Sequence, residues 1–247
     1  DAGHYYLQDG TPFYTIIGKN GKERPTTLRD VRQVNAVPSV TTVMKCMAKP
    51  GLDNWIQNQV VLSALTMPRI DGEPEEDYIQ RIKADSREQC RKAADRGTII
   101  HGQLERAFLG EKFDDAYSEV VSGTFKAMQK YFGEQNWLPE KSFANYGFGG
   151  KVDLHSNEWV IDYKTKEFDE CKLPDVYDEH CMQLAAYRVG LDKPLARCAN
   201  VFVSVSNPGL VHIVEHKADD LHRGWNMFSH LLKFWQAKNK YHPVTPL

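Results

Sequence analysis

The segment Gly149–His155 reads Gly-Gly-Lys-Val-Asp-Leu-His, and the segment Trp159–Lys164 reads Trp-Val-Ile-Asp-Tyr-Lys. Charged and apolar residues alternate in both segments, which is typical of β-strands because successive side chains point to opposite faces of a sheet. Only three residues separate the two segments, and such a short connection is typical of a turn. The sequence therefore predicts two neighbouring antiparallel strands with charged side chains set into an apolar sheet.

The turn decides how the charged side chains of the two strands pair. With residues 157–158 as the loop, paired positions have numbers that add to 315. Asp153 then lies directly opposite Asp162, and a register slip of one residue would separate them. Lys164 shares a face with Asp162, because the two are two residues apart in a strand.

Two carboxylates in this position need a compensating charge. Like charges directly opposite one another are unfavourable in a sheet, and at a partly buried site about 4 Å apart they repel by ~4 kcal/mol. A divalent cation between Asp153 and Asp162 is the natural remedy. Hard oxygen ligands favour Mg²⁺ or Mn²⁺ over zinc. The alternative is a surface hairpin with scattered charges, but the apolar strands and the double glycine before them favour a built site.

Outside these strands, the patterning predicts the order helices, three strands, helix, two strands, helix. This order indicates an α/β fold with a central mixed sheet flanked by helices. We expect residues 1–75 to form an N-terminal hairpin and helical accessory region, and residues 76–247 to form the core. The hairpin would pair His4–Leu7 with Phe13–Ile17 around Asp9-Gly10. The predicted strands and helices are Ser142–Asn145, Asn200–Val205, Leu210–His216, Asp53–Thr66, Glu75–Leu109 with a break near Gly97, Tyr117–Phe132, Asp178–Val189 and Asp219–Lys238.

Two helical segments carry further polar pairs. His101 and Glu105 are four residues apart and share a helical face, where an imidazole and a carboxylate can add a metal ligand and its support. Gln183 and Tyr187 have the same spacing, next to small residues that permit close packing on a sheet. Each pair alone is equally typical of a solvated or packed helix face.

Composition excludes some classes of protein. The chain has 247 residues, a formal net charge of −2 and no apolar run near the ~20 residues that span a membrane. Its five cysteines are widely spaced without a CxxC pair, which argues against a disulfide framework and a zinc site. Bulk charge does not favour nucleic-acid binding, although metal-site carboxylates count as negative in it. We expect a cytoplasmic protein of a bacterial or phage-infected cell, or a mitochondrial one if a transit peptide has been removed.

Together, these motifs resemble the RecB-like branch of the PD-(D/E)XK nuclease superfamily over about residues 38–205. The opening segment Pro38–Thr41, followed by Leu52-x-x-Trp55, is similar to that of phage-encoded and mitochondrial genome-maintenance exonucleases. The resemblance implies a restriction-endonuclease-like core. The ordered motifs are Gly97-x-x-x-His101, Gly150-x-x-Asp153, Asp162-Tyr163-Lys164-Thr165 and Gln183-x-x-x-Tyr187.

The resemblance also implies roles at the site. His101, Asp153 and Asp162 would bind one or two Mg²⁺ or Mn²⁺ ions, with the backbone carbonyl of Tyr163 as a further ligand. Lys164 would orient the attacking water or help to deprotonate it, and would offset charge on the scissile phosphate. We expect no iron–sulfur cluster, because the cysteines do not have the spacing of the relatives that carry one.

Other residues would support this centre. Gln183 and Tyr187 would hold Lys164 and the substrate phosphate, and Glu105 and Glu140 are candidate supporting residues. Basic residues that could track a DNA backbone are Arg91, Lys92, Arg96, Lys166 and Lys172, with Arg96 and Lys166 as the chosen candidates.

The activity implied is that of a metal-dependent exonuclease in DNA recombination, repair or replication, which leaves 5′-phosphates. Its partner would be DNA, either single-stranded or with free ends, and no membrane. Two alternatives stay open at this point: a structure-specific or restriction-type endonuclease of the same fold, and a catalytically inactive DNA-binding module.

Overall fold

The computed structural model describes residues 3–243 of the chain. It divides into two compact units, one formed by Asp1–Met47 together with Gln103–Leu247 and the other by Ala48–Gly102. We call them the sheet unit and the hairpin unit. The division falls at different residues from the expected boundary near residue 75, because the N-terminal segment packs onto the sheet.

The sheet unit contains a five-stranded mixed sheet with the strand order β5-β6-β7-β8-β9. Neighbouring strands run antiparallel except for β7 and β8, which are parallel. Helix α6, Asp178–Gly190, connects these two strands, since parallel neighbours need a crossover. The strands are β5 Leu138–Asn145, β6 Phe148–His155, β7 Trp159–Lys166, β8 Arg197–Ser204 and β9 Val211–His216.

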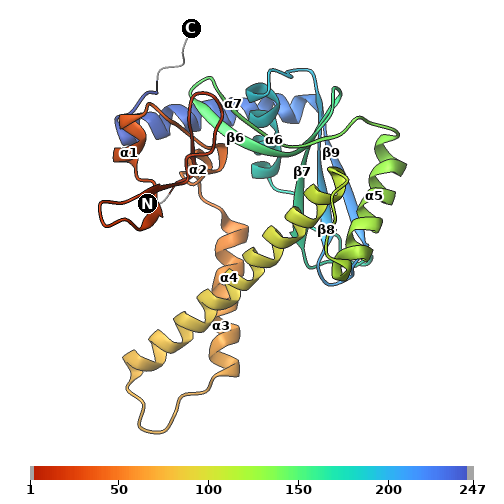
Figure 1. Cartoon of the computed structure of the whole chain (residues 1–247). Coiled ribbons are helices and arrows are strands. Elements are labelled where there is room, and N and C mark those ends of the chain that lie inside the picture. Colours follow the sequence, from red (N-terminus) through yellow and green to blue (C-terminus); the bar gives the residue numbers. More distant parts are fainter. Residues whose placement is uncertain (1–2, 244–247) are drawn as a thin grey trace. The chain divides into compact units, whose positions relative to one another are not determined.

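Helices cover both faces of this sheet (Figure 1). Helix α6 packs against α7, Ala218–Asn239, on one face, where Sγ of Cys198 in β8 lies 3.9 Å from a backbone carbonyl of α6. Helix α5, Ser118–Phe132, covers the other face, where the hydroxyl of Tyr163 lies 3.8 Å from Sδ of Met128. The predicted fold class, α/β with a central mixed sheet flanked by helices, is confirmed.

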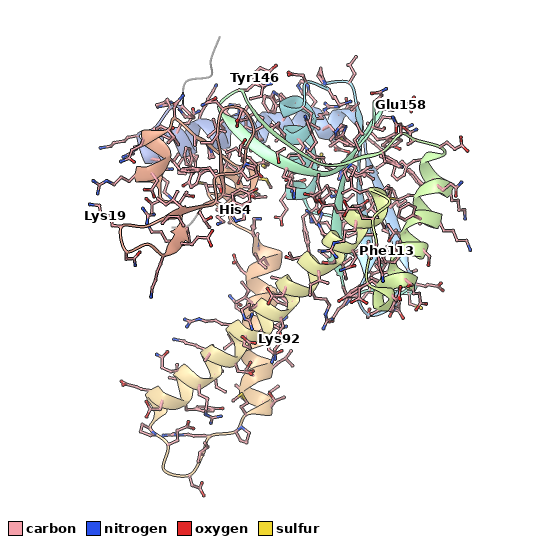
Figure 2. The ribbon with its side chains drawn as sticks, viewed as in Figure 1. His4, Lys19, Lys92, Phe113, Tyr146 and Glu158 are labelled. Carbon is pink, nitrogen blue, oxygen red and sulfur yellow. The ribbon has the colours of Figure 1, made fainter. Side chains whose placement is uncertain are left out.

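The two central strands are buried on both faces. Val160 and Ile161 in β7, like Val201 and Phe202 in β8, are fully buried. This agrees with the apolar runs Trp159–Ile161 in β7 and Val201–Val203 in β8. Tyr146 and Glu158, labelled in Figure 2, lie in the turns at the two ends of β6.

The five cysteines are free thiols in the structure. Burial raises the pKa of Cys181 to about 11 and that of Cys198 to about 12. Neither thiol is therefore ionised at neutral pH, and both behave as small apolar side chains in the core.

The predicted N-terminal hairpin forms only in part. Strand β1, Tyr5–Tyr6, pairs with β4, Val37–Pro38, while β2, Thr15–Ile17, pairs with β3, Glu23–Pro25. The turn around Asp9-Gly10 does form, and beyond it lie an isolated bridge between Tyr6 and Pro12 and a 2.8 Å hydrogen bond from the N–H of Phe13 to the carbonyl of Tyr5. Proline has no N–H to donate, so it interrupts the ladder that the predicted hairpin requires. Two short helices complete the segment: α1, Leu28–Gln33, and α2, Val40–Met44.

The hairpin unit contains α3, Pro50–Thr66, and most of α4, Glu75–Phe108, which continues into the sheet unit. Ser63 on α3 donates a 2.8 Å hydrogen bond to Asp85 on α4. The expected break of α4 near Gly97 is wrong, since the helix is continuous there. A single glycine costs a helix only about 1 kcal/mol, which the rest of a 34-residue helix offsets. Within residues 3–243, no helix is long and apolar enough to span a membrane.

Candidate active site

The ladder between β6 and β7 is short. Its pairs are Leu154 with Ile161 and His155 with Val160, which is the predicted register. At the next position the strands are joined by a side chain, because the backbone N–H of Tyr163 donates a 2.7 Å hydrogen bond to Oδ2 of Asp153. Asp153 thus lies at the point where β6 separates from β7.

The neighbouring strand β5 is irregular at the same level. The β5–β6 ladder runs through the pairs Pro139–Leu154 and Lys141–Val152 but has no pair between them. Glu140 occupies that position with a φ of 56°, a conformation that costs a non-glycine residue roughly 1–3 kcal/mol. Its carboxylate forms an ion pair with Lys151. Glu140 is therefore held beside β6 near Asp153, and its supporting role stays a prediction.

Asp162 is a buried carboxylate, with only 3% of its surface exposed. Its Oδ2 atom lies 2.6 Å from Nζ of Lys164, two residues along β7 on the same face. The same oxygen accepts a 2.7 Å hydrogen bond from the side-chain amide of Asn200. A buried charge is tolerated only when it is paired and hydrogen-bonded, and these two donors supply that compensation.

Lys164 is held from the other side by helix α6. Its Nζ donates a 3.0 Å hydrogen bond to Oε1 of Gln183. The amide of Gln183 in turn donates a 2.8 Å hydrogen bond to the hydroxyl of Tyr187, one helical turn further on. The structure thus joins Asp162, Lys164, Gln183 and Tyr187 in one continuous chain of polar contacts, with the ammonium group at its centre.

Behind Asp162 lies a pair of residues that the sequence analysis missed. Asn200 stands beside Asp162 in the parallel ladder, and its Oδ1 lies 2.7 Å from Nε2 of His216. Because the amide nitrogen of Asn200 faces the carboxylate, its oxygen must accept, so Nε2 of His216 carries the proton. Burial lowers the pKa of His216, which favours this neutral form. The sequence signal that could have identified Asn200 is its position as a lone polar residue inside the apolar run of β8.

Both carboxylates act on the same buried phenol. The pKa of Tyr187 is raised, first by burial and then by the negative charge of Asp162, with a smaller contribution from Asp153. Burial, followed by Asp153, also raises the pKa of Tyr163 well above its usual value. Both aspartates therefore act on Tyr187, which Gln183 connects to the ammonium group of Lys164.

The donor set suits a hard cation. Asp153 and Asp162 offer carboxylate oxygens and no sulfur, which fits Mg²⁺ or Mn²⁺. Among the residues that the structure describes, no group of three or more His, Cys, Asp or Glu side chains is placed to hold a metal ion. Mg²⁺ is often bound through one or two carboxylates together with water and substrate phosphate, so a pair of aspartates fits such an ion.

The remaining predicted residues lie as follows. Lys166, at the end of β7, has its Nζ 4.8 Å from the ring centre of Tyr177, and burial lowers the pKa of the amine. Glu105 is a partly buried residue of α4 in the sheet unit. Arg96 and His101 lie on α4 within the hairpin unit. The roles of these four residues stay predictions.

Two surface pockets border α5, on the opposite face of the sheet from Asp162. They lie beside the stacked rings of Phe108 and Phe125, whose centres are 4.2 Å apart. Neither pocket is lined by a predicted site residue. We therefore take the polar chain around Lys164, and neither of these pockets, as the candidate active site of the sheet unit.

No protein-family model matches the sequence, and no curated protein matches it. Among solved structures, the chain is similar to an alkaline exonuclease from Laribacter hongkongensis, with 13% identity and a TM-score of 0.36, over 57% of this chain and 79% of the exonuclease. It is also similar to the protein SSO0001, with 14% identity and a TM-score of 0.31, over 75% of this chain and 87% of that protein. Likenesses this distant carry no argument about activity, which has to rest on the residues of the site.

Proposed function

We propose that this chain is a divalent-metal-dependent nuclease that hydrolyses DNA phosphodiester bonds. One observation carries the proposal: the ammonium group of Lys164 is held between Asp162 and Gln183, next to the β6–β7 opening at Asp153. A fixed cation beside two carboxylates suits a reaction in which an anionic phosphate must be bound and attacked. A surface salt bridge would not need the partly buried amide of Gln183 and the buried phenol of Tyr187 behind it.

The reaction is an in-line displacement at phosphorus. A water oxygen forms a bond to phosphorus while the bond from phosphorus to the 3′-oxygen breaks, the water loses a proton, and the leaving 3′-oxygen gains one. The products are a 5′-phosphate and a 3′-hydroxyl. Asp153 and Asp162, with the backbone carbonyl of Tyr163 as a further ligand implied by the resemblance, would hold a Mg²⁺ or Mn²⁺ ion, which would supply Lewis acidity to this centre.

The residues of the chain account for the other requirements. The Nζ of Lys164 donates hydrogen bonds, so it orients the attacking water and offsets the charge that grows on the phosphate oxygens. Gln183 fixes the position of that ammonium group, and Tyr187 fixes Gln183. Lys166 lies two residues further along β7 and supplies a second positive charge for the DNA backbone.

We further propose that the substrate is DNA with a free end. The test is a gel assay with 5′- and 3′-labelled single- and double-stranded DNA and with closed circles, in Mg²⁺, Mn²⁺ and EDTA. Metal-dependent shortening from one end, with circles intact, is the expected result and gives the polarity. Cutting of circles would identify an endonuclease instead.

Two variants complete the assay. Lys164→Ala removes the central ammonium group and is expected to abolish cleavage. Lys130→Ala removes an exposed lysine of α5 and is expected to cleave as the unmodified protein does. Binding of DNA without cleavage in any metal would show that the chain is a DNA-binding module and would overturn the proposal.

A further inference from the structure

The N-terminal segment forms the far boundary of the opening at Asp153. Ser39 makes a parallel bridge to Gly149, so β6 is bordered by β7 at one end and by the N-terminal segment at the other. A Cβ atom at Gly149 would lie 2.8 Å from the ring of Tyr6, and one at Gly150 would lie 2.8 Å from the ring of Tyr187. The double glycine therefore makes room for two aromatic rings beside the site.

Tyr6 belongs to a small aromatic cluster that reaches the surface. Its hydroxyl is hydrogen-bonded to that of Tyr14, and the two rings meet edge to face with centres 5.5 Å apart. On Tyr14 lies the imidazole of His4, stacked at 4.6 Å with an angle of 28° between the planes. His4 is exposed, and Tyr14 is partly buried. Figure 2 labels His4 on the N-terminal segment.

Electrostatic interactions connect this cluster to the site. Tyr14 contributes to the raised pKa of Tyr187, after burial and the two aspartates, and Tyr187 contributes to that of Tyr6. The rings of Tyr6 and Tyr187 lie beside the adjacent glycines Gly149 and Gly150, so the N-terminal cluster is close to the last member of the polar chain that runs from Asp162 through Lys164 and Gln183. Partial burial and the positive charge of Lys45 lower the pKa of His4, which favours the neutral form of its ring.

We propose that His4 and Tyr14 form a stacking platform for one unpaired nucleobase of the DNA strand whose phosphate occupies the site. This inference rests on the proposed nuclease function. An exposed, neutral, planar ring backed by a second ring is suited to stacking on a base, and stacking accepts any base because each has a π-face. Lys45 is exposed near His4 and suits the adjoining phosphate.

The occupant is a single-stranded segment, because a base inside a duplex has both faces covered by its neighbours. The platform also has a fixed geometry. The hydrogen bond between the hydroxyls of Tyr6 and Tyr14 fixes the ring of Tyr14, on which His4 stacks. The backbone N–H of His4 donates a 2.9 Å hydrogen bond to the hydroxyl of Thr42. A base that stacks on His4 therefore meets a surface that is already ordered.

The test is an abasic scan. Fluorescence anisotropy in EDTA measures the binding of labelled single-stranded oligonucleotides, each lacking one base at a different position. For the unmodified protein, one position is expected to lose about tenfold in affinity when its base is absent. His4→Ala is expected to bind the complete oligonucleotide about tenfold more weakly and to lose that position-specific effect. Tyr14→Phe keeps the aromatic ring and is expected to retain the position-specific effect of the missing base.

Phe234→Ala, which removes an exposed aromatic ring of α7, is the matched control and is expected to keep the full abasic effect. Equal abasic profiles for the unmodified protein and His4→Ala would overturn the platform while leaving the nuclease proposal intact. Absence of both DNA binding and cleavage in the unmodified protein would overturn both. Thermal unfolding of His4→Ala separates loss of stacking from loss of folding, since an exposed ring is expected to leave Tm nearly unchanged.

Discussion

The backbone amide of Tyr163 donates a 2.7 Å hydrogen bond to Oδ2 of Asp153 at the position where β6 and β7 stop pairing. The carboxylate thus occupies the place of the backbone carbonyl that a continuous ladder would offer to this N–H. Asp153 therefore has a structural role in the sheet besides its proposed role toward metal and phosphate. The two roles differ in what they require, since the first needs only an acceptor oxygen and the second needs a negative charge.

Two substitutions separate these roles. Asp153→Ala removes the acceptor of the Tyr163 amide and is expected to lower the free energy of unfolding by about 1–3 kcal/mol. Asp153→Asn keeps an acceptor oxygen and is expected to cost less than about 1 kcal/mol. Both are expected to reduce cleavage by at least about 100-fold, because the charge is lost. Urea unfolding and the gel assay measure the two effects, and full cleavage by Asp153→Asn would remove Asp153 from the active site.

Asn200 holds the buried carboxylate of Asp162 and is expected to matter for stability. Asn200→Ala removes a hydrogen bond to a charged group, and we expect the free energy of unfolding to fall by about 2–3 kcal/mol. Asn207→Ala removes a bond to a neutral carbonyl, that of Phe168, and is expected to cost about 1 kcal/mol. Urea unfolding of both variants provides the comparison. Equal decreases in the free energy of unfolding would show that the hydrogen bond to Asp162 stabilises the fold no more than a hydrogen bond to a neutral carbonyl.

Gln183 is expected to act on the reaction through Lys164. Gln183→Ala leaves the ammonium group paired with Asp162 but without its second anchor, and we expect kcat to fall about 10- to 100-fold because a catalytic group is displaced. The dissociation constant for DNA is expected to change little. Gln129→Ala on the exposed face of α5 is the control, with unchanged kcat. A weaker DNA affinity with an unchanged kcat would contradict a positioning role.

The strands around the site could be predicted because local patterning decides them. The charged residues of β6 and β7 alternate with apolar ones, and the short connection leaves few registers, so the pairing of Leu154 with Ile161 follows from the sequence. The spacing of Gln183 and Tyr187 likewise predicts a shared helical face, and the two are hydrogen-bonded. Such features depend on neighbours along the chain, which a sequence displays directly.

Contacts between distant segments could not be predicted in this way. The partner of Asp162 comes from Asn200, and the ring that fills the space beside Gly149 comes from Tyr6. These pairs are set by the tertiary packing of strands and of the N-terminal segment, which no local period records. The N-terminal hairpin, which forms only in part, shows the same limit, because the continuous partner of β1 is the distant strand β4.

The stability of the fold is expected to depend on pH through His216. Burial lowers its pKa below the value of about 6.5 in the unfolded chain, with Asp220 opposing this shift weakly. The unfolded state then binds a proton at His216 more strongly than the folded state does. The contribution of neutral His216 to the free energy of unfolding is therefore fully present above about pH 6.5, and it is lost as the pH falls from that value to the folded-state pKa. His216→Gln keeps a donor for Asn200 and is expected to reduce the slope of stability against pH in this interval, by at most about 1.4 kcal/mol per pH unit.

Unfolding midpoints of His216→Gln and the unmodified protein, measured in urea from pH 5 to pH 8, check this expectation. The difference between the two proteins isolates His216 from other buried histidines, such as His180. A difference that stays constant over the whole range would contradict the assignment of a depressed pKa to His216.

Gly123 on α5 is expected to tolerate no side chain. A Cβ atom there would lie 2.4 Å from the carbonyl oxygen and 2.5 Å from the Cα atom of Gly209, in the turn between β8 and β9. Because both atoms belong to the backbone, the clash cannot be relieved by a rotamer change, and we expect Gly123→Ala to destabilise the fold by about 1–3 kcal/mol. Gly102 on α4 has no neighbouring atom within 4 Å of such a Cβ. Gly102→Ala is therefore expected to stabilise the chain by about 0.5–1 kcal/mol through helix propensity. Opposite shifts of Tm for the two variants would support this packing of α5 against the turn, whereas a stabilising Gly123→Ala would show that the turn does not approach α5 so closely.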